Sequence, residues 1–246
     1  MFLQEPGYSR GDLNFRLLGF PVRVHPMFWL MTAMMAWSGG GEMRPEELVI
    51  WVTVVFISIL VHELGHALAA RYFGGEAEIV LYQFGGLAIH RPQPRYTWQR
   101  VAISLAGPGA GFLLGFATIA LVAATGHHVE PHLDWIPFFW FPLNDRNLDQ
   151  AVFNLMFVNF YWGLFNLLPI YPLDGGQVAR NLLVRYDHFD GLRKSQWLSV
   201  IVAVALAAYV WHASQGTRMI TVLMLGFLAF QNYQELRGPW GTRNPW

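Results

Sequence analysis

Long apolar runs alternate with short polar segments along most of the chain. Six runs approach the roughly 20 mainly apolar residues that a membrane-spanning helix needs: about 18–37, 48–73, 100–125, 151–170, 196–213 and 217–232. Pro21 and Pro26 interrupt the first run, and the last two runs are short. The pattern predicts an all-α membrane protein built as a six-transmembrane-helix bundle. We find no internal repeat and no soluble appendage, so residues 1–246 are expected to form a single polytopic membrane domain.

Composition agrees with a membrane protein and narrows the possible chemistry. Apolar residues make up 54% of the chain and charged residues 13%, against about 25% charged residues in a typical soluble domain. Sixteen basic residues balance sixteen acidic ones, so nothing indicates the clustered basic face with which proteins bind nucleic acid. The chain has no cysteine, which excludes disulfides and leaves His, Asp and Glu as ligands for a transition metal.

Basic residues predict the orientation in the membrane, because short cytoplasmic loops are enriched in Lys and Arg. A six-helix path that starts inside the cell puts thirteen of the sixteen basic residues in the cytoplasm and only Arg44, Arg146 and Arg218 outside. The first twenty-five residues include charges and lack a clean apolar core, so we expect no cleaved signal peptide. We therefore expect a multi-pass protein of the cell (inner) membrane with both termini in the cytoplasm.

Two segments have glycines at positions that indicate a structural role. Residues 76–90 contain two β-prone stretches around Gly85 and Gly86, which indicates a small re-entrant β-hairpin on the cytoplasmic side. An exposed strand edge there could hold an extended peptide by β-addition; alternatively, the hairpin is only structural. Gly107, Gly111 and Gly115 recur every four residues on the third run, a spacing that lets membrane helices approach closely.

The second apolar run contains a metal-binding pattern, His62-Glu63-Leu64-Gly65-His66. On a helix, the two histidines of H-E-x-x-H face the same side and can bind one metal ion, and the glutamate can act as general base on a metal-bound water. Ionisable residues at membrane depth cost roughly 2.5–3.5 kcal/mol by insertion scales, so they are rare and usually functional. The alternative is a hydrogen-bonded trio that holds helices together.

A catalytic zinc site normally takes three protein ligands and leaves one position to water, so a third ligand is needed. Asp174 follows the fourth apolar run, with Pro169 and Pro172 before it and Gly175 and Gly176 after it. The prolines break the helix, and the glycines permit a tight turn back toward the bundle. In the six-helix path, this carboxylate and the two imidazoles lie at matching depth near the cytoplasmic side. The alternative role for Asp174 is that of a helix cap or turn residue.

The two motifs HELGH and NLLPIYPLDGG, in that order on two apolar segments, resemble the site-2 protease family of intramembrane zinc metalloproteases. They resemble in particular the compact bacterial branch of this family, which is similar to the sporulation factor processing protease. The resemblance extends to the sequences VHP at 24–26, FGGLA at 84–88 and SLAGP at 104–108. In this family two His and one Asp bind zinc and the Glu is the catalytic base, which implies these roles for His62, His66, Asp174 and Glu63.

The resemblance implies further site residues. Asn166 would donate to the developing oxyanion, or else make only an interhelical hydrogen bond. Phe84, Gly85 and Gly86 would contact the substrate on the hairpin. His25 would face the zinc site, or else be an interfacial histidine with partners of its own.

The sequence therefore predicts an intramembrane zinc metalloendopeptidase with one Zn²⁺ and an active site toward the cytoplasmic side. The expected substrate is a single-pass membrane protein, such as an anti-sigma factor or a pro-protein, and the lipid bilayer is the other partner. The catalytic core would cover about 48–185, flanked by helices at about 18–37, 196–213 and 217–232. The alternative is a catalytically silent membrane binding protein, or a zinc-handling carrier, on the same scaffold.

Overall fold

The structure is a computed structural model that describes residues 7–37, 44–83, 85–91, 94–126, 130–132, 138–140, 143–215 and 218–237. The chain forms two compact units. Unit 1 comprises Met1–Gln93 and Ala106–Leu164, and unit 2 comprises Pro94–Leu105 and Phe165–Trp246. Each unit contains a hydrophobic cluster of its own.

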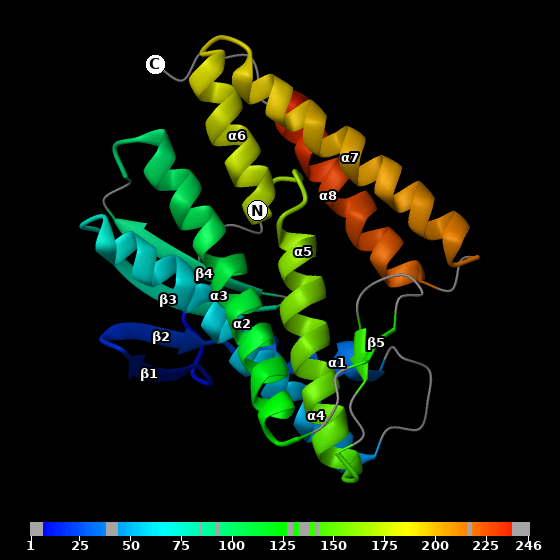
Figure 1. Ribbon diagram of the computed structural model, residues 1–246. Helices are drawn as coiled ribbons and strands as arrows, with labels where there is room; N and C mark the ends of the chain where they lie inside the picture. The colour runs from blue at the N-terminus through cyan, green and yellow to red at the C-terminus, as the bar shows by residue number, and fades with distance from the viewer. Residues whose placement is uncertain are drawn as a thin grey trace. The chain divides into compact units, whose positions relative to one another are not determined.

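A four-stranded sheet with the order β1-β2-β3-β4 lies in unit 1 (Figure 1). β1 (Leu13–Leu17) and β2 (Phe20–Val24) form an antiparallel hairpin, with Gly19 at a positive φ in its turn. β3 (Glu76–Tyr82) and β4 (Gly85–Arg91) pair as the predicted antiparallel hairpin. β2 pairs in parallel with β3 and so joins the two hairpins, which leaves β4 at an edge of this sheet.

The prediction of one helix over residues 18–37 is wrong in its first part. Residues 20–24 form β2, and only α1 (Pro26–Trp37) is helical. Pro21 has no backbone N–H for an interior helical bond, and the β-branched Val22 and Val24 are buried in the sheet, which suits their side chains. The 12 residues of α1 extend about 18 Å, less than the roughly 30 Å hydrocarbon core of a bilayer.

α2 (Pro45–Tyr72) is the helix predicted for the second apolar run. Pro45 stands in the first turn, where its missing N–H removes no helical hydrogen bond. Glu47 accepts a hydrogen bond from the Arg44 backbone N–H at 3.3 Å and so closes this end of the helix. Its 28 residues extend about 42 Å, and they pack against β3, β4 and α4 within unit 1.

The fourth predicted run is helical but is not a uniform α-helix. Asp145 caps the start of α4 (Arg146–Phe157), because its side chain accepts hydrogen bonds from two backbone N–H groups. α4 continues as a π-helix, η1 (Val158–Trp162), and then as α5 (Gly163–Asn166). Ahead of α4, β5 (Glu130–His132) pairs with β6 (Phe138–Trp140) as a two-stranded sheet.

Asn159 joins the π-helix to α2. Its Nδ2 atom donates to Ser58 Oγ at 2.9 Å and to the Leu155 carbonyl at 2.8 Å. Asn159 and Ser58 are both 3% exposed, and a buried amide is costly unless it is hydrogen-bonded. This is the interhelical hydrogen bond that polar residues in membrane helices commonly make, and it lies one helical turn before His62.

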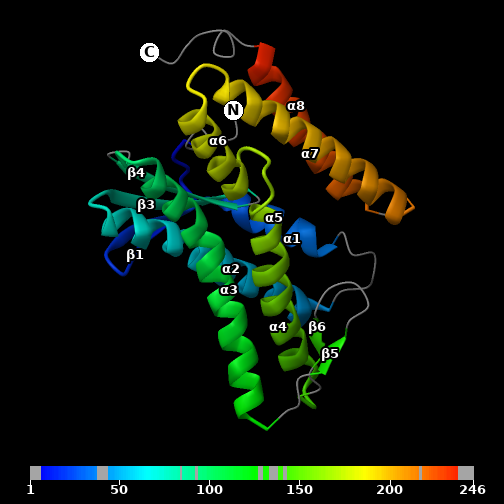
Figure 2. The ribbon, with the colours of Figure 1, turned by 45° about the horizontal axis from the view of Figure 1, so that its top comes forward.

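The helices of unit 2 are α6 (Asp174–Tyr186), α7 (Gly191–Ala213) and α8 (Met219–Arg237). α7 and α8 lie side by side over most of their length (Figures 1 and 2), and they are the helices predicted for the last two apolar runs. They enclose a buried cluster with the turn that precedes α6: Ile170, Ala203, Leu225, Leu228 and Ala229. α3 (Thr97–Ala124) begins in unit 2 and ends in unit 1.

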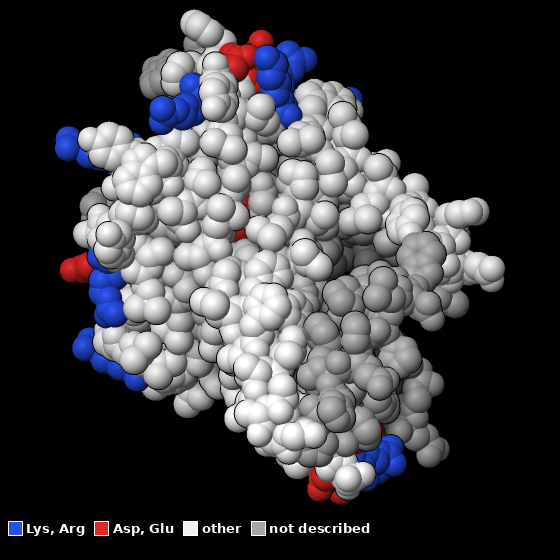
Figure 3. All heavy atoms as spheres, in the orientation of Figure 1, with Lys and Arg blue, Asp and Glu red and all other residues white. Residues whose placement is uncertain are grey.

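Charged side chains close the turn between α6 and α7. Asp187 accepts hydrogen bonds from Lys194 Nζ and from the backbone N–H groups of Phe189 and Asp190. The Lys194 hydrogen bond, followed by that of the Asp190 N–H, holds the pKa of Asp187 at about 2. Figure 3 shows one group of Lys, Arg, Asp and Glu side chains at the end of the molecule where α6 and α7 meet, and residues 195–213 of α7 contain none of these four.

Three helices in the described residues are long and apolar enough to cross a membrane: α2, α3 and α7. α1 is a shorter apolar helix. The protein is thus mostly helical with a small sheet and three candidate membrane spans, in agreement with the helical membrane architecture predicted from the sequence.

Candidate functional site

His62, Glu63 and His66 lie in the last third of α2, which is uninterrupted at this point. The 3.6-residue period of the helix places the two histidines on one face. All three side chains are buried, with exposed fractions of 7%, 5% and 8%. The helix thus holds three ionisable groups together in an apolar segment, where they need strong partners.

The two imidazoles meet through their Nε2 atoms, which are 3.1 Å apart. Their rings stand edge to face, with centroids 4.9 Å apart and an interplanar angle of 77°. A carboxylate oxygen of Glu63 lies within 4.8 Å of the ligand atoms of both rings. Among the described residues, this is the group of His, Asp and Glu side chains that could hold a metal ion.

This donor set fits zinc. Zinc binds imidazole nitrogen at about 2.0–2.1 Å, so two nitrogens on one tetrahedral ion are about 3.3–3.4 Å apart, close to the 3.1 Å that separates the two Nε2 atoms. The imidazoles are buried and converge, as a metal-binding site requires. The adjacent carboxylate is placed to exchange a proton with a group held there.

The backbone of α3 approaches His66 closely at Gly107. A Cβ added at Gly107 would lie 2.2 Å from His66 Nε2 and 2.4 Å from its Cε1, and a Cβ at Gly65 would lie 2.3 Å from the Ala106 carbonyl oxygen. Real Cβ contacts are not this short, so only glycine fits at these two positions. The predicted close helix approach is therefore present, and at Gly107 it touches the candidate ligand itself, a role that the sequence analysis did not assign.

The start of β4 lies against Glu63. A Cβ added at Gly86 would lie 2.3 Å from Glu63 Cγ and 2.6 Å from its Oε1, whereas a Cβ at Gly85 would meet nothing within 4 Å. The edge strand that we expected to contact a substrate therefore begins beside the candidate base. Phe84, the third residue expected there, lies outside the described residues.

Replacing Gly86 with alanine should displace the Glu63 carboxylate without touching the imidazoles. We expect kcat for peptide cleavage to fall roughly 10²-fold, because a misplacement of about 1 Å can cost that much, with zinc content unchanged. The measurement is steady-state cleavage together with metal analysis of the purified variant. Gly109→Ala, which adds the same methyl group into open space on α3, should cleave at the native rate, and a native kcat for Gly86→Ala would contradict the prediction.

His25 lies just before α1 and contacts the end of β3. Its Nδ1 accepts a hydrogen bond from the Met27 backbone N–H at 3.1 Å, and its backbone N–H donates to the Leu81 carbonyl. Its ring stands edge to face on Tyr82, with centroids 4.9 Å apart. These contacts are those of a histidine with partners of its own, and a role for His25 in substrate binding stays a prediction.

Asp174 and Asn166 belong to unit 2. Asp174 is the first residue of α6 and Asn166 the last of α5, and both are 9% exposed. The turn between them is packed backbone against backbone: a Cβ at Gly175 would lie 2.0 Å from the Leu167 carbonyl oxygen, and one at Gly176 would lie 2.3 Å from the Ile170 carbonyl carbon. The glycines lie in the first turn of α6 and not in a turn of their own, and they let the preceding backbone pack directly against this helix.

Tyr171 lies at the centre of this turn, and its peptide bond to Pro172 is cis. The Arg180 guanidinium of α6 lies over the Tyr171 ring, 4.7 Å from its centroid. Burial raises the pKa of the Tyr171 hydroxyl, and the positive charge of Arg180 opposes this shift.

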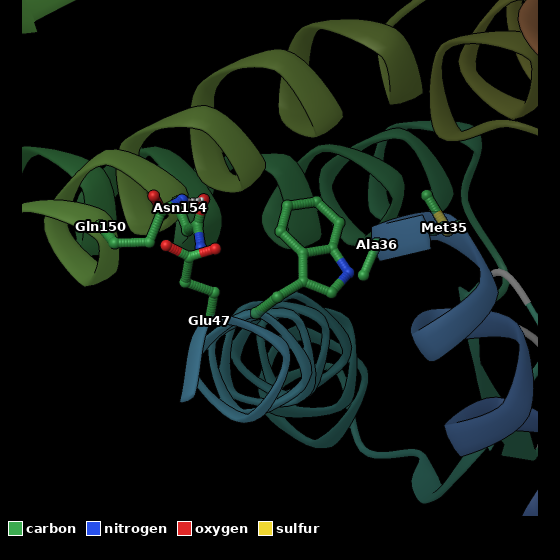
Figure 4. Close-up of a pocket in the computed structure, with 6 residues that line it drawn as sticks. Met35, Ala36, Glu47, Gln150 and Asn154 are labelled. Carbon is green, nitrogen blue, oxygen red and sulfur yellow. Dashed lines mark hydrogen bonds between the residues drawn. The ribbon is translucent and has the colours of Figure 1, made fainter. Parts of the chain in front are cut away.

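A cavity of about 250 Å³ lies at the opposite end of α2 from the histidines. It is lined by residues of α1, α2 and α4: Met35, Ala36, Glu47, Trp51, Gln150 and Asn154. Figure 4 shows Gln150, Asn154 and Glu47 close together on one side of it and Met35 and Ala36 on the other. Trp51 and His62 are eleven positions apart, about 16 Å along the helix, so this cavity is not the candidate metal site.

Comparisons with known proteins point to one peptidase family. The family model described as Peptidase family M50 matches residues 50–210, a range that includes both motifs. A zinc metalloprotease of Methanocaldococcus jannaschii is 27% identical over 228 residues, which cover 91% of this chain and 60% of that protein. Stage IV sporulation protein FB of Bacillus subtilis is 28% identical over 205 residues, which cover 77% of this chain and 61% of that protein.

A solved structure has the same fold. The site-2 protease from Methanocaldococcus jannaschii matches with a TM-score of 0.58 and 23% identity, over 92% of this chain and 96% of that one. The curated relatives are longer proteins, and this chain spans between 42% and 61% of their length.

Proposed function

The chain belongs to peptidase family M50, and on that premise we propose that it is an intramembrane zinc metalloendopeptidase. The observation that supports this most directly is the pair of buried Nε2 atoms 3.1 Å apart, with the Glu63 carboxylate beside them in an apolar helix. His62 and His66 would supply two zinc ligands. Asp174 is the proposed third ligand, on the strength of its motif and of its burial at the start of α6.

The chain's own residues have distinct roles in the proposed hydrolysis. Bound zinc supplies a Lewis acid that lowers the pKa of a coordinated water and polarises the peptide carbonyl. Glu63 accepts a proton as the water oxygen attacks the carbonyl carbon, and returns it to the amide nitrogen as the C–N bond breaks. Asn166 would donate a hydrogen bond to the oxygen on which negative charge develops.

Strand β4 is the proposed substrate platform. It is an edge strand of the described sheet, and its second residue, Gly86, lies against Glu63. An extended peptide that adds to this edge would pass close to the base, because its backbone would pair with β4. Phe84, Gly85, Gly86 and His25 are the residues proposed to contact it.

The proposed setting is the inner membrane, with the chain acting as a single polytopic domain whose catalytic core covers about 48–185. α2, α3 and α7 meet the length and hydropathy of membrane spans, and we propose that the α4–α5 stretch and α8 cross as well. α1 extends only about 18 Å, so this remaining one of the six predicted helices would enter the membrane for part of its depth. The hairpin of β3 and β4 would be re-entrant on the cytoplasmic side, where the active site and both termini would also lie. The proposed substrate is a single-pass membrane protein, such as an anti-sigma factor or a pro-protein.

Metal analysis combined with a cleavage assay tests this proposal. We expect the purified protein to contain one zinc per chain, chelation to stop cleavage of a co-expressed membrane substrate, and added zinc to restore it. His66→Ala should lose both zinc and cleavage, because it removes one of the two imidazoles that converge. A chain that binds zinc without cleaving would instead favour the zinc-handling carrier or the catalytically silent binding protein. A chain that binds no zinc would favour the silent binding protein.

A further inference from the structure

We propose that Ser199 of α7 and Asn232 of α8 are positioning residues for Asp174, acting through the backbone of Tyr171. The inference rests on the proposed role of Asp174 as a zinc ligand. It assigns a task to α8, which lies beyond residues 50–210 that the family model matches. All the contacts that support it lie within unit 2.

The backbone of Tyr171 is held by two other helices rather than by its own turn. Its N–H donates to Ser199 Oγ at 2.9 Å, and its carbonyl accepts from Asn232 Nδ2 at 2.6 Å. The neighbouring residues bond locally, since the Ile170 N–H donates to the Leu168 carbonyl and the Leu173 N–H donates to the Ile170 carbonyl. Tyr171 is therefore the point at which α7 and α8 fix the turn.

The side chains of Ser199 and Asn232 are buried and use their hydrogen bonds to join their helices to the turn. Each is 1% exposed, and burial of a hydroxyl or an amide is costly without hydrogen bonds. Ser199 Oγ donates to the Ser195 carbonyl at 2.9 Å, and the second N–H of Asn232 donates to the Leu228 carbonyl at 2.8 Å. Each side chain thus links its own helix backbone to Tyr171.

The position of Tyr171 affects that of Asp174 through direct contact between the backbone before the turn and the first turn of α6. Gly176, two residues after Asp174, leaves no space for a Cβ beside the Ile170 carbonyl and the Tyr171 nitrogen, both 2.3 Å from that position. The backbone before the turn and the first turn of α6 are therefore in direct contact. A shift of Tyr171 must displace the start of α6, and with it the Asp174 carboxylate.

Zinc affinity is the property that such a displacement changes, because ligand distances vary by only a few tenths of an ångström in zinc sites. Loss of a group that orients a metal ligand typically weakens metal affinity 10–100-fold. We expect a loss of this size for Asn232→Leu, which keeps the volume but removes both donors. Ser199→Ala should have a similar effect, and Ser199→Thr, which keeps the hydroxyl, should bind zinc like the native protein.

The experiment measures the zinc affinity of the full-length protein in detergent by competition with a chelator, together with thermal unfolding and hydrogen exchange of residues 170–174. Ser195→Ala is the matched control, because the Ser195 hydroxyl is buried in the same helix but donates to the Leu192 carbonyl of that helix. This control should keep native zinc affinity even where it lowers the unfolding temperature. Asn232→Leu and Ser199→Ala should also speed exchange in the turn.

Asp174→Ala, measured in parallel, separates the two proposals. If Asp174→Ala keeps native zinc affinity, the proposed ligand set fails and the positioning role fails with it. If Asp174→Ala loses affinity while Ser199→Ala and Asn232→Leu keep it, only the positioning role is overturned. If Asn232→Leu does not fold, the Ser199 pair decides: weaker binding by Ala than by Thr supports the role, and equal binding overturns it.

Discussion

Glu63→Gln should lower the rate of peptide cleavage by about 10²–10⁴-fold, the range expected when a general acid–base group is lost. Glutamine keeps the shape of the side chain, which lies against Gly86 and is 5% exposed, but it cannot accept the proton from the attacking water. Zinc should stay bound, because both imidazoles are unchanged. The measurement is cleavage of a co-expressed membrane substrate, with zinc content determined on the same preparation.

Glu46→Gln is the matched control for this experiment. It makes the same chemical change in the same helix, at an exposed position in its first turn, and should leave cleavage unchanged. A Glu63→Gln protein that retains zinc and cleaves at the native rate would remove Glu63 from the mechanism. Joint loss of zinc and cleavage would show instead that Glu63 supports the metal site.

Gly107→Ala should weaken zinc binding roughly 10–100-fold, the loss typical when the surroundings of a ligand are disturbed. The new methyl group would lie 2.2 Å from His66 Nε2, the atom expected to bind the metal. To relieve this contact, either the buried His66 ring must rotate or α3 must move away from α2. Cleavage should fall in parallel at limiting zinc and recover in part when zinc is raised.

Gly109→Ala provides the comparison, because a Cβ there meets nothing within 4 Å. It lies two residues further along α3, and alanine favours the helix more than glycine does, so its zinc affinity should be native. Equal affinities for the two variants would show that α3 does not restrict His66.

The part of the site that is local in sequence could be predicted. The spacing of His62 and His66 fixes their common face once the segment is helical, and an apolar run of this length is a reliable helix signal. The structure agrees, with α2 at Pro45–Tyr72 against a predicted run of 48–73. The glycine pair after Asp174 indicated a tight turn, whereas Gly175 and Gly176 lie in the first turn of α6 and leave no room for side chains against the turn that precedes it.

Contacts between distant segments could not be predicted in the same way. Residues 18–24 look apolar enough to extend a helix, but β2 pairs in parallel with β3, more than fifty residues away. The glycine spacing of α3 indicated close packing without showing that Gly107 faces His66. Ser199 and Asn232 carry no local signal, because only the folded turn brings the Tyr171 backbone to them.

The π-helix at Val158–Trp162 changes how this part of the chain must be compared with its relatives. A π-helix contains about one more residue per turn than an α-helix, and one residue corresponds to roughly 100° of rotation about the axis. A helical wheel drawn through residues 146–166 as one α-helix would therefore assign the wrong faces after Gly163. An aligned relative without the extra residue would present equivalent side chains only if a gap is placed inside this segment.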